Sequence, residues 1–307
     1  MKPDLSVKLG PLELANPVMT ASGTFGYGSE YEEFFDPSIL GAVVVKGVAP
    51  NPVHGNPTPR VAEVASGMIN AIGLQGPGIE KFLHDEHYLP WLRKHNCKTV
   101  VNIWGKSVDD YRYVAERLDA DSDGIAALEI NVSCPNVKEG GISFSSDTAA
   151  MGKVVAAVRS ATKRPLITKL SPNVSSMPEF ARAAAANGSD VVSMINTIPA
   201  MAIDIETRRP KIANITGGLS GPAVKPVAVK MVYETARAID IPIIGMGGIF
   251  SGEDAVAFLL AGASAIAVGT AIFTDPLAPL KVLGGISAYL ERHGCKSVTE
   301  IIGQVRV

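Results

Sequence analysis

The sequence contains few cysteines and no spacing that would link them. Its 307 residues include three, Cys97, Cys134 and Cys295, and none forms a Cys-x-x-Cys pair. An odd number of widely separated cysteines argues against a disulfide framework and against a zinc knuckle. We therefore expect a cytoplasmic protein of a reducing compartment.

The sequence also lacks a strong charge of either sign and a long membrane-like segment. With 28 basic and 30 acidic residues the formal net charge is −2, which argues against a general affinity for nucleic acid or an anionic membrane. No basic segment followed by an apolar one opens the chain, so we expect no secretion signal.

One uncharged run, residues 255–274, approaches membrane-spanning length. Because Gly262, Ser264 and Gly269 interrupt it, we interpret it as a helix end, a turn and a strand.

Glycine and proline are abundant, and short β-branched apolar runs alternate with amphipathic segments. Together the two residue types number 51, or about 17% against a usual ~12%, which favours many tight loops. Apolar runs without alternation suit parallel strands buried on both faces, and eight of them alternating with helices predict one (β/α)8 barrel domain over residues 1–307. A doubly wound sheet is the alternative. The expected strands are 17–21, 42–46, 99–103, 126–132, 166–170, 190–196, 241–246 and 265–269, and the expected helices are 78–95, 108–119, 148–162, 176–187, 222–239 and 253–261.

Three long connections, 47–75, 133–147 and 197–221, follow the second, fourth and sixth expected strands. In a barrel such loops lie over the C-terminal face, where active sites are built. A short N-terminal hairpin, 7–9 and 12–14, is expected to cover the opposite face.

Glycine-rich turns follow the last two strands, at Gly247-Gly248 and at Gly269-Thr270. Glycine lets bare backbone amides approach an anion, and loops after strands seven and eight form the usual phosphate site of a barrel. The dinucleotide fingerprint is a weaker reading, because Phe250 occupies its third glycine position and no acidic residue ends the next strand. Turns that need glycine for backbone reasons alone are the other alternative.

Lysines and asparagines stand at or after several strand ends. Lys46 and Lys169 each finish an apolar strand, where an unpaired buried charge is costly, so each must reach the rim or meet an anion. Amides supply the donors and acceptors that suit a ring with alternating C=O and N–H groups. The asparagines are Asn70, Asn102, Asn131, Asn136 and Asn196. Rim lysines and turn-forming asparagines are the alternative interpretation.

Cys134 differs from the other two cysteines because Ser, Pro and Asn surround it in the loop after the fourth strand. A free thiol has a pKa of about 8.5, so a modest fall makes a usable base or nucleophile near neutrality. Cys97 and Cys295 are interpreted as small buried apolar residues.

Six strings, in order along nearly the whole chain, resemble the dihydroorotate dehydrogenase family: 16–23 (NPVMTASG), 55–60 (GNPTPR), 70–75 (NAIGLQ), 131–136 (NVSCPN), 217–222 (GGLSGP) and 245–248 (GMGG). Cysteine at 134, where class 2 members have serine, and the lack of an N-terminal membrane-associating extension point to class 1. The string 136–141 (NVKEGG) resembles class 1B more than the fumarate-using class 1A. Gly76 departs from the asparagine that the family pattern would have.

The resemblance implies an FMN lined by Ser22, Lys46, Gly47, Asn102, Asn131, Lys169 and Ile195, with its phosphate held by Gly221, Gly247, Gly248, Gly269 and Thr270. It implies that dihydroorotate is surrounded by Lys46, Asn70, Ala71, Ile72, Gly73, Leu74, Asn131, Asn136, Asn196 and Thr197. Cys134 would remove the proton from C5 while the hydride leaves C6 for the flavin, and Lys169 would supply positive charge beside the flavin ring.

The resemblance to class 1B further implies NAD as the final electron acceptor. The Gly-x-Gly turn after the seventh expected strand is already assigned to the FMN phosphate, and three scattered cysteines cannot supply the four thiolates usual for a [2Fe–2S] cluster. We therefore expect a separate subunit that carries FAD and [2Fe–2S], and a pair of catalytic chains within a heterotetramer. The alternatives are a class 1A enzyme, a dihydropyrimidine dehydrogenase-like enzyme, a dihydrouridine synthase, and a non-enzymatic phosphate-binding barrel.

Overall fold

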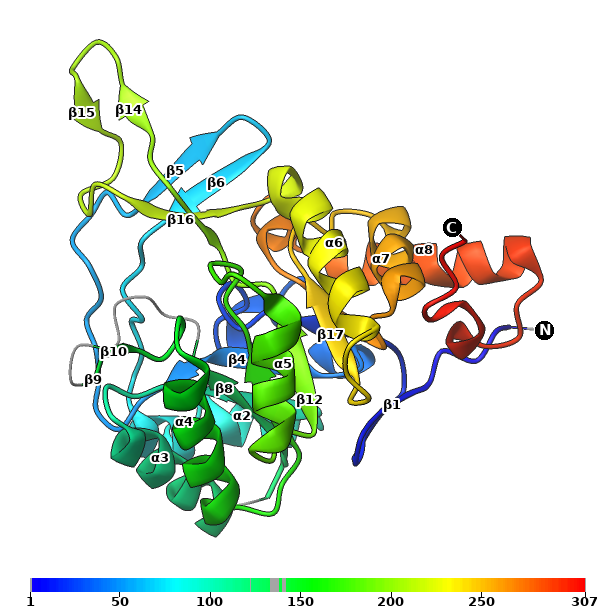
Figure 1. Cartoon of the computed structure of the whole chain (residues 1–307), viewed down its shortest axis with the longest axis horizontal. Helices are drawn as coiled ribbons and strands as arrows, with labels where there is room; N and C mark the ends of the chain where they lie inside the picture. The colour runs from blue at the N-terminus through cyan, green and yellow to red at the C-terminus, as the bar shows by residue number, and fades with distance from the viewer. Residues whose placement is uncertain (1, 122, 133–137, 140–141, 307) are drawn as a thin grey trace.

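The fold is an eight-stranded parallel barrel surrounded by helices (Figure 1). The computed structural model describes residues 2–121, 123–132, 138–139 and 142–306. Neighbouring barrel strands pair in parallel, and all eight predicted strands are confirmed to within a few residues. In spatial order they are β3 (Val18–Thr20), β18 (Ala265–Val268), β17 (Ile243–Met246), β12 (Val191–Met194), β11 (Leu166–Lys169), β8 (Ile125–Asn131), β7 (Thr99–Ile103) and β4 (Val43–Val48).

The first and last strands of that order meet and close the barrel. Met19 of β3 forms a parallel bridge with Ala42, just before β4. The hydroxyl of Thr20 accepts from the Val44 N–H at 2.8 Å and donates to the Val44 carbonyl at 3.1 Å. The Thr20 side chain thus forms the hydrogen bonds with the Val44 backbone that the backbone of β3 would form if the two strands stayed paired. Closure excludes the open doubly wound sheet.

Eight helices lie between and after the strands in the part of the chain that is described. They are α1 (Ile79–His84), α2 (Leu89–Lys94), α3 (Val108–Ala120), α4 (Thr148–Ala161), α5 (Met177–Ala186), α6 (Lys225–Ala236), α7 (Gly252–Ala261) and α8 (Ala278–His293). The run 255–274 is confirmed as a helix end, a turn and strand β18. No described helix is both long enough and apolar enough to cross a membrane.

Two expected helices differ from the prediction. The expected helix 78–95 is two helices, because the chain turns at Asp85, whose carboxylate accepts from the His87 N–H at 3.0 Å. Pro90 then lies in the first turn of α2, where its missing N–H costs no hydrogen bond. The expected helix 222–239 begins with a 3-10 turn, Pro222–Val224, and α6 ends at Ala236.

The predicted N-terminal hairpin is confirmed as β1 (Val7–Leu9) and β2 (Leu12–Leu14). Its leucines are buried, and Lys98, just before β7, donates to the carbonyl of Glu13. A Cβ placed on Gly10 would lie 3.4 Å from the carbonyl oxygen of Asp190, just before β12. Both contacts are made at the start of barrel strands, so the hairpin covers the N-terminal face.

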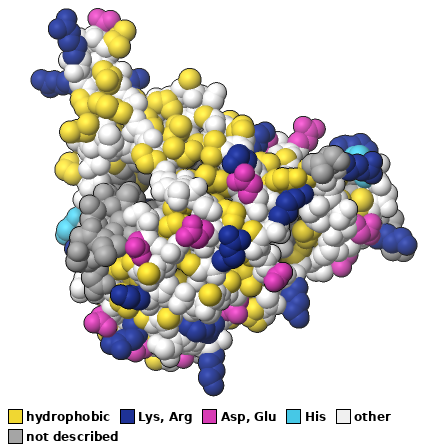
Figure 2. All heavy atoms as spheres, in the orientation of Figure 1, with side chains coloured by type: hydrophobic (Ala, Val, Ile, Leu, Met, Phe, Trp, Pro, Cys, Tyr) yellow, Lys and Arg dark blue, Asp and Glu magenta, His cyan; other side chains and the backbone are white. Residues whose placement is uncertain are grey.

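The long loops build a second sheet that the sequence did not predict. Strands β13 (Ile198–Ala200), β16 (Gly217–Ser220), β6 (Gly67–Asn70) and β5 (Val61–Val64) form an antiparallel sheet in that order. Two shorter ladders pair β14 (Ile203–Asp204) with β15 (Arg209–Pro210) and β9 (Lys138–Glu139) with β10 (Ile142–Ser143). The β14–β15 hairpin projects from the body (Figure 1) and carries apolar and basic side chains (Figure 2), including Ile205, which is 81% exposed.

Candidate active site

Two adjoining cavities open at the C-terminal ends of the barrel strands, beneath the antiparallel sheet. The first, here the polar cavity, is lined by Lys46, Lys169 and a ring of amide side chains. The second, here the glycine cavity, is lined by the turns after β17 and β18 and by the sheet. They share six lining residues and so form one continuous hollow: Gly23, Asn70, Ile72, Lys169, Asn196 and Thr197.

The two lysines of the polar cavity differ in the contacts that their side chains make. Lys169 ends β11, is 6% exposed, and donates to the hydroxyl of Ser22 at 3.3 Å. The ammonium group of Lys46 in β4 makes no hydrogen bond or ion pair with any other described residue. Burial lowers the pKa of Lys46, and the nearby positive charges of Arg60 and Lys169 lower it further, against a weaker opposing effect of Glu30. Two cations in one recess suit an anionic ligand, such as a carboxylate.

Four of the five predicted asparagines meet in the polar cavity: Asn70, Asn102, Asn131 and Asn196. They come from β6, β7, β8 and the segment after β12, which are far apart in sequence. Asn70 donates to the Gly218 carbonyl at 3.3 Å, and Asn196 accepts from the Thr197 N–H at 2.8 Å. Asn136 and Cys134 lie outside the described residues.

The predicted substrate loop also lines the polar cavity, with Ala71, Ile72, Gly73 and Leu74. The segment before β5 holds this loop in place with two hydrogen bonds. Asn56 donates to the Ala71 carbonyl at 2.9 Å, and the Ala71 N–H donates to the Arg60 carbonyl at 2.8 Å. A Cβ on Gly73, whose φ is +78°, would approach Asn56 within 2.7 Å. Only glycine allows this close approach of the two segments.

The glycine cavity brings together three backbone segments at close range. Gly247 and Gly248 have φ values of +122° and +76°. A Cβ on Gly248 would lie 2.8 Å from the carbonyl oxygen of Gly221 and 3.0 Å from the backbone nitrogen of Lys225. Gly269 and Thr270 of the neighbouring turn line the same cavity, as does Ile195. Bare amides gathered in this way form a cradle that suits a phosphate group.

Sequence analysis missed several lining residues. In the polar cavity these are Asn56, Gln75, Asn173, Asn214 and Thr216, and in the glycine cavity Val61, Met68, Leu219 and Phe273. Most lie in or beside the antiparallel sheet, whose strands pair residues about 150 positions apart, and local patterns carry no signal for such pairing. A buried carboxyl group, Glu129, was also missed because it stands within an otherwise apolar strand.

Comparison with known families decides between the remaining interpretations. A family model described as dihydroorotate dehydrogenase matches residues 4–290. The chain belongs to the dihydroorotate dehydrogenase family. It is therefore an oxidoreductase, and the resemblance drawn from the six sequence strings is confirmed.

Curated relatives and a solved structure agree with this membership. The chain is 53% identical over 304 residues to "Dihydroorotate dehydrogenase B (NAD(+)), catalytic subunit" of Bacteroides fragilis, with 99% of both chains covered. It is 53% identical over 303 residues to the protein of the same name from Alkaliphilus oremlandii, covering 98% of this chain and 99% of that one. The crystal structure of a dihydroorotate dehydrogenase from Eimeria tenella in complex with ferulenol matches with a TM-score of 0.80 at 26% identity, over 98% of this chain and 88% of that chain.

Proposed function

We propose that this chain is the FMN-containing catalytic subunit of an NAD-linked dihydroorotate dehydrogenase, oxidising (S)-dihydroorotate to orotate in pyrimidine biosynthesis. The observation that carries the proposal is the single hollow that joins a lysine- and amide-lined cavity to a glycine cradle. The full-length identity to NAD-linked catalytic subunits supports the same reading.

The residues of the hollow fit FMN. The Gly248 cradle is a place where any Cβ would collide with backbone, and the buried Asn102 Oδ1 has no partner among the described residues. Ser22, Lys46, Gly47, Asn102, Asn131, Lys169 and Ile195 would hold the ring, and Gly221, Gly247, Gly248, Gly269 and Thr270 the phosphate. FMN held there would supply the hydride-accepting chemistry that oxidation at C6 of dihydroorotate needs. Lys169 would supply positive charge beside the ring.

Substrate recognition is assigned to the polar cavity. The ammonium group of Lys46 would attract the substrate carboxylate, since it has no partner of its own in the described part of the chain. Asn70, Asn131, Asn136 and Asn196 would pair with the C=O and N–H groups of the pyrimidine, which need donors and acceptors together. The backbone of residues 71–74 and Thr197 would complete the enclosure.

Proton removal from C5 is assigned to Cys134. This residue follows β8, whose last residue, Asn131, lines the polar cavity, so its loop starts at the hollow. The assignment is based on the sequence resemblance, because Cys134 itself lies outside the described residues. After a modest fall in its pKa, a thiol gives enough thiolate near neutral pH to act as a base.

Electron transfer away from the flavin is assigned to a second subunit carrying FAD and a [2Fe–2S] cluster, with NAD as the final acceptor. The relatives' name, catalytic subunit of an NAD(+) enzyme, supports such a division. A homodimer of this chain within a heterotetramer and a cytoplasmic location complete the proposal.

Anaerobic mixing of the purified protein with dihydroorotate tests the proposal most simply. We expect bleaching of the flavin absorbance and formation of orotate, followed by reoxidation with an artificial dye. NAD should be reduced only after the partner subunit is added. A colourless preparation that FMN cannot reconstitute would overturn the flavin assignment. Rapid NAD reduction by the isolated chain would remove the partner, and fast fumarate turnover would move the protein to the fumarate-using class.

A further inference from the structure

A buried carboxyl group lies in the barrel interior, deeper than the polar cavity. Glu129 stands on β8, two residues before the cavity-lining Asn131, and is 2% exposed. Asn102 Nδ2 of β7 donates to Glu129 Oε2 at 2.6 Å, and Ser193 Oγ of β12 donates to Glu129 Oε1 at 2.8 Å. One side chain thus ties three barrel strands together just below the site.

The hydrogen bond to Glu129 fixes the way in which the Asn102 amide faces. An amide has donors on one side and an acceptor on the other, so an Nδ2 turned to Glu129 turns Oδ1 away from it. The reverse orientation would set two acceptor oxygens against each other in a buried place, which is costly. Glu129 therefore leaves Asn102 only one favourable orientation.

The Asn102 Oδ1 atom is buried and has no partner among the described residues. It lies beside Gly47, since a Cβ on Gly47 would be 3.0 Å from it, and both residues line the polar cavity. A buried acceptor without a partner costs free energy that a bound donor would recover. The ring of FMN carries an imide N–H between two carbonyl groups, and that N–H needs an acceptor.

We propose that Glu129 is a positioning residue that holds Asn102 with its oxygen available to a hydrogen-bond donor of the bound flavin. The inference rests on the proposed FMN binding. Glu129 itself contacts neither flavin nor substrate in this account, and it acts through Asn102 alone. Its role resembles that of the outer partners that orient the ligands of metal sites.

Release of FMN from the flavin-loaded protein on dilution, followed by flavin fluorescence, measures the role without any assay of turnover. Glu129→Met keeps a similar length and removes both acceptors, so we expect FMN to bind about tenfold more weakly. Glu129→Gln should bind FMN within about twofold of the wild type. Its amide can accept from Asn102 and donate to the Ser193 hydroxyl, which can also accept.

A matched control and a double-mutant cycle separate positioning from general damage to the barrel. Thr168→Val removes another buried polar contact, the 2.9 Å Thr168–Ser189 pair on the neighbouring strand, and should leave FMN binding unchanged. In an Asn102→Ala background, Glu129→Met should weaken FMN binding by less than about twofold further, because its effect passes through Asn102. If Glu129→Met does not fold, Ser193→Ala takes its place, with an expected weakening of about threefold that also vanishes in the Asn102→Ala background.

The outcomes distinguish a failure of the proposed function from a failure of the role proposed for Glu129. A wild-type protein that binds no FMN overturns the proposed function and the role of Glu129 with it. A wild-type protein that binds FMN, together with a Glu129→Met variant that binds it equally well, overturns the positioning role alone. The same conclusion follows if the loss in Glu129→Met is undiminished in the Asn102→Ala background, or if Glu129→Gln is as impaired as Glu129→Met.

Discussion

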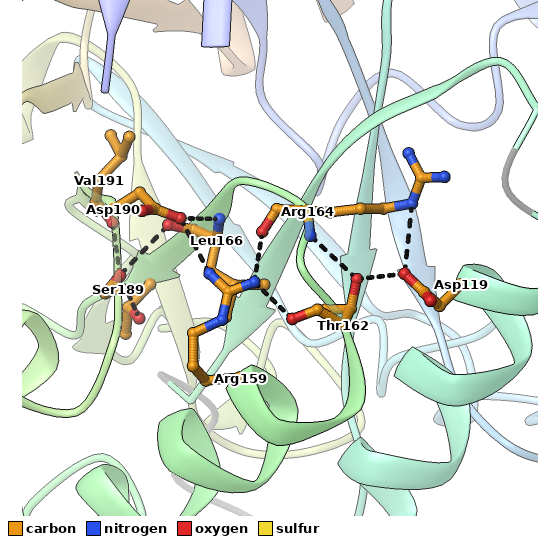
Figure 3. Close-up of polar contacts among 9 residues, drawn as sticks. Asp119, Arg159, Thr162, Arg164, Leu166, Ser189, Asp190 and Val191 are labelled. Atoms are coloured by element: carbon orange, nitrogen blue, oxygen red, sulfur yellow. Dashed lines mark hydrogen bonds and ion pairs between the residues drawn. The ribbon is translucent and has the colours of Figure 1, made fainter. Parts of the chain in front are cut away.

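The two ends of the barrel treat polar side chains in opposite ways. At the N-terminal end, charged groups satisfy one another (Figure 3). Arg159 forms an ion pair with Asp190 at 3.1 Å and donates to the Arg164 carbonyl at 2.9 Å, while Asp190 also accepts from the Leu166 N–H at 2.8 Å. Arg164 in turn lies 3.8 Å from Asp119. The network ties α3 and α4 to the starts of β11 and β12.

At the C-terminal end, several polar groups lack such partners within the described residues. The Lys46 ammonium group has no hydrogen bond or ion pair with a described residue, and the buried Asn102 Oδ1 has no hydrogen-bond partner among them. Unsatisfied groups reduce stability, so a protein retains them where a ligand supplies the missing partner. The comparison teaches that the charged groups named at the N-terminal end pair with one another, whereas Lys46 and Asn102 at the C-terminal end keep polar atoms available to a ligand in the polar cavity.

The largest effect is expected from Cys134→Ala, in the loop that opens at the binding end. The variant should retain FMN and its thermal stability, yet reduce flavin with dihydroorotate about 10²- to 10⁴-fold more slowly. Stopped-flow absorbance at neutral pH measures the rate. Cys134→Ser should be slow and recover toward high pH, because a hydroxyl is a much weaker acid than a thiol. Near-normal reduction in the alanine variant would remove Cys134 from the mechanism.

A change at the opposite end should affect stability alone. Arg159→Met leaves Asp190 without its ion pair and is expected to lower the free energy of unfolding by about 2 kcal/mol. Urea denaturation measures the loss, and FMN release and orotate affinity should be unchanged. Lys230→Met is the control, because its pair with Glu234 is exposed and contributes at most about 0.5 kcal/mol. Weakened orotate binding in Arg159→Met would contradict the division of stability and binding between the two ends of the barrel.

Lys46→Met is expected to change the free energy of unfolding by a smaller amount than Arg159→Met and in the opposite direction. Removing a partly buried charge that has no partner among the described residues should raise the free energy of unfolding by about 1 kcal/mol while weakening orotate binding at least about tenfold. The pH dependence sharpens the test. The folded-state pKa of Lys46 is lowered, chiefly by burial, so its unfavourable contribution is full below that pKa and disappears as pH rises toward the unfolded value. The advantage of Lys46→Met should therefore shrink at alkaline pH, and an advantage that is constant with pH would contradict this account.

The strands of the barrel could be predicted because each is a short apolar run whose burial on both faces leaves a clear local pattern. The strand-end lysines and four of the asparagines could be located for the same reason, since parallel strands end on one face. The antiparallel sheet could not, because β16 includes Gly217 and Gly218, which carry no strand signal, and its partner β6 is distant in sequence.

Glu129 shows a second limit of sequence reasoning. Its position in strand β8 was predicted, but its partners come from β7 and β12, and only the folded barrel brings Asn102 and Ser193 to its two oxygens. The broken helix after β6 shows a third limit, because the Asp85 turn competes with helix continuation through a side-chain hydrogen bond.

The central claim is that binding and stability are divided between the two ends of the barrel. The orotate-induced rise in melting temperature, measured in parallel on flavin-loaded wild type, Arg159→Met and Lys46→Met, tests it directly, because a ligand stabilises only a protein that binds it. We predict a full rise in Arg159→Met, starting from a lower melting temperature than the wild type, and little or no rise in Lys46→Met, whose flavin-free form should melt at a higher temperature than the flavin-free wild type. A rise that is lost in Arg159→Met or retained in Lys46→Met would contradict the account.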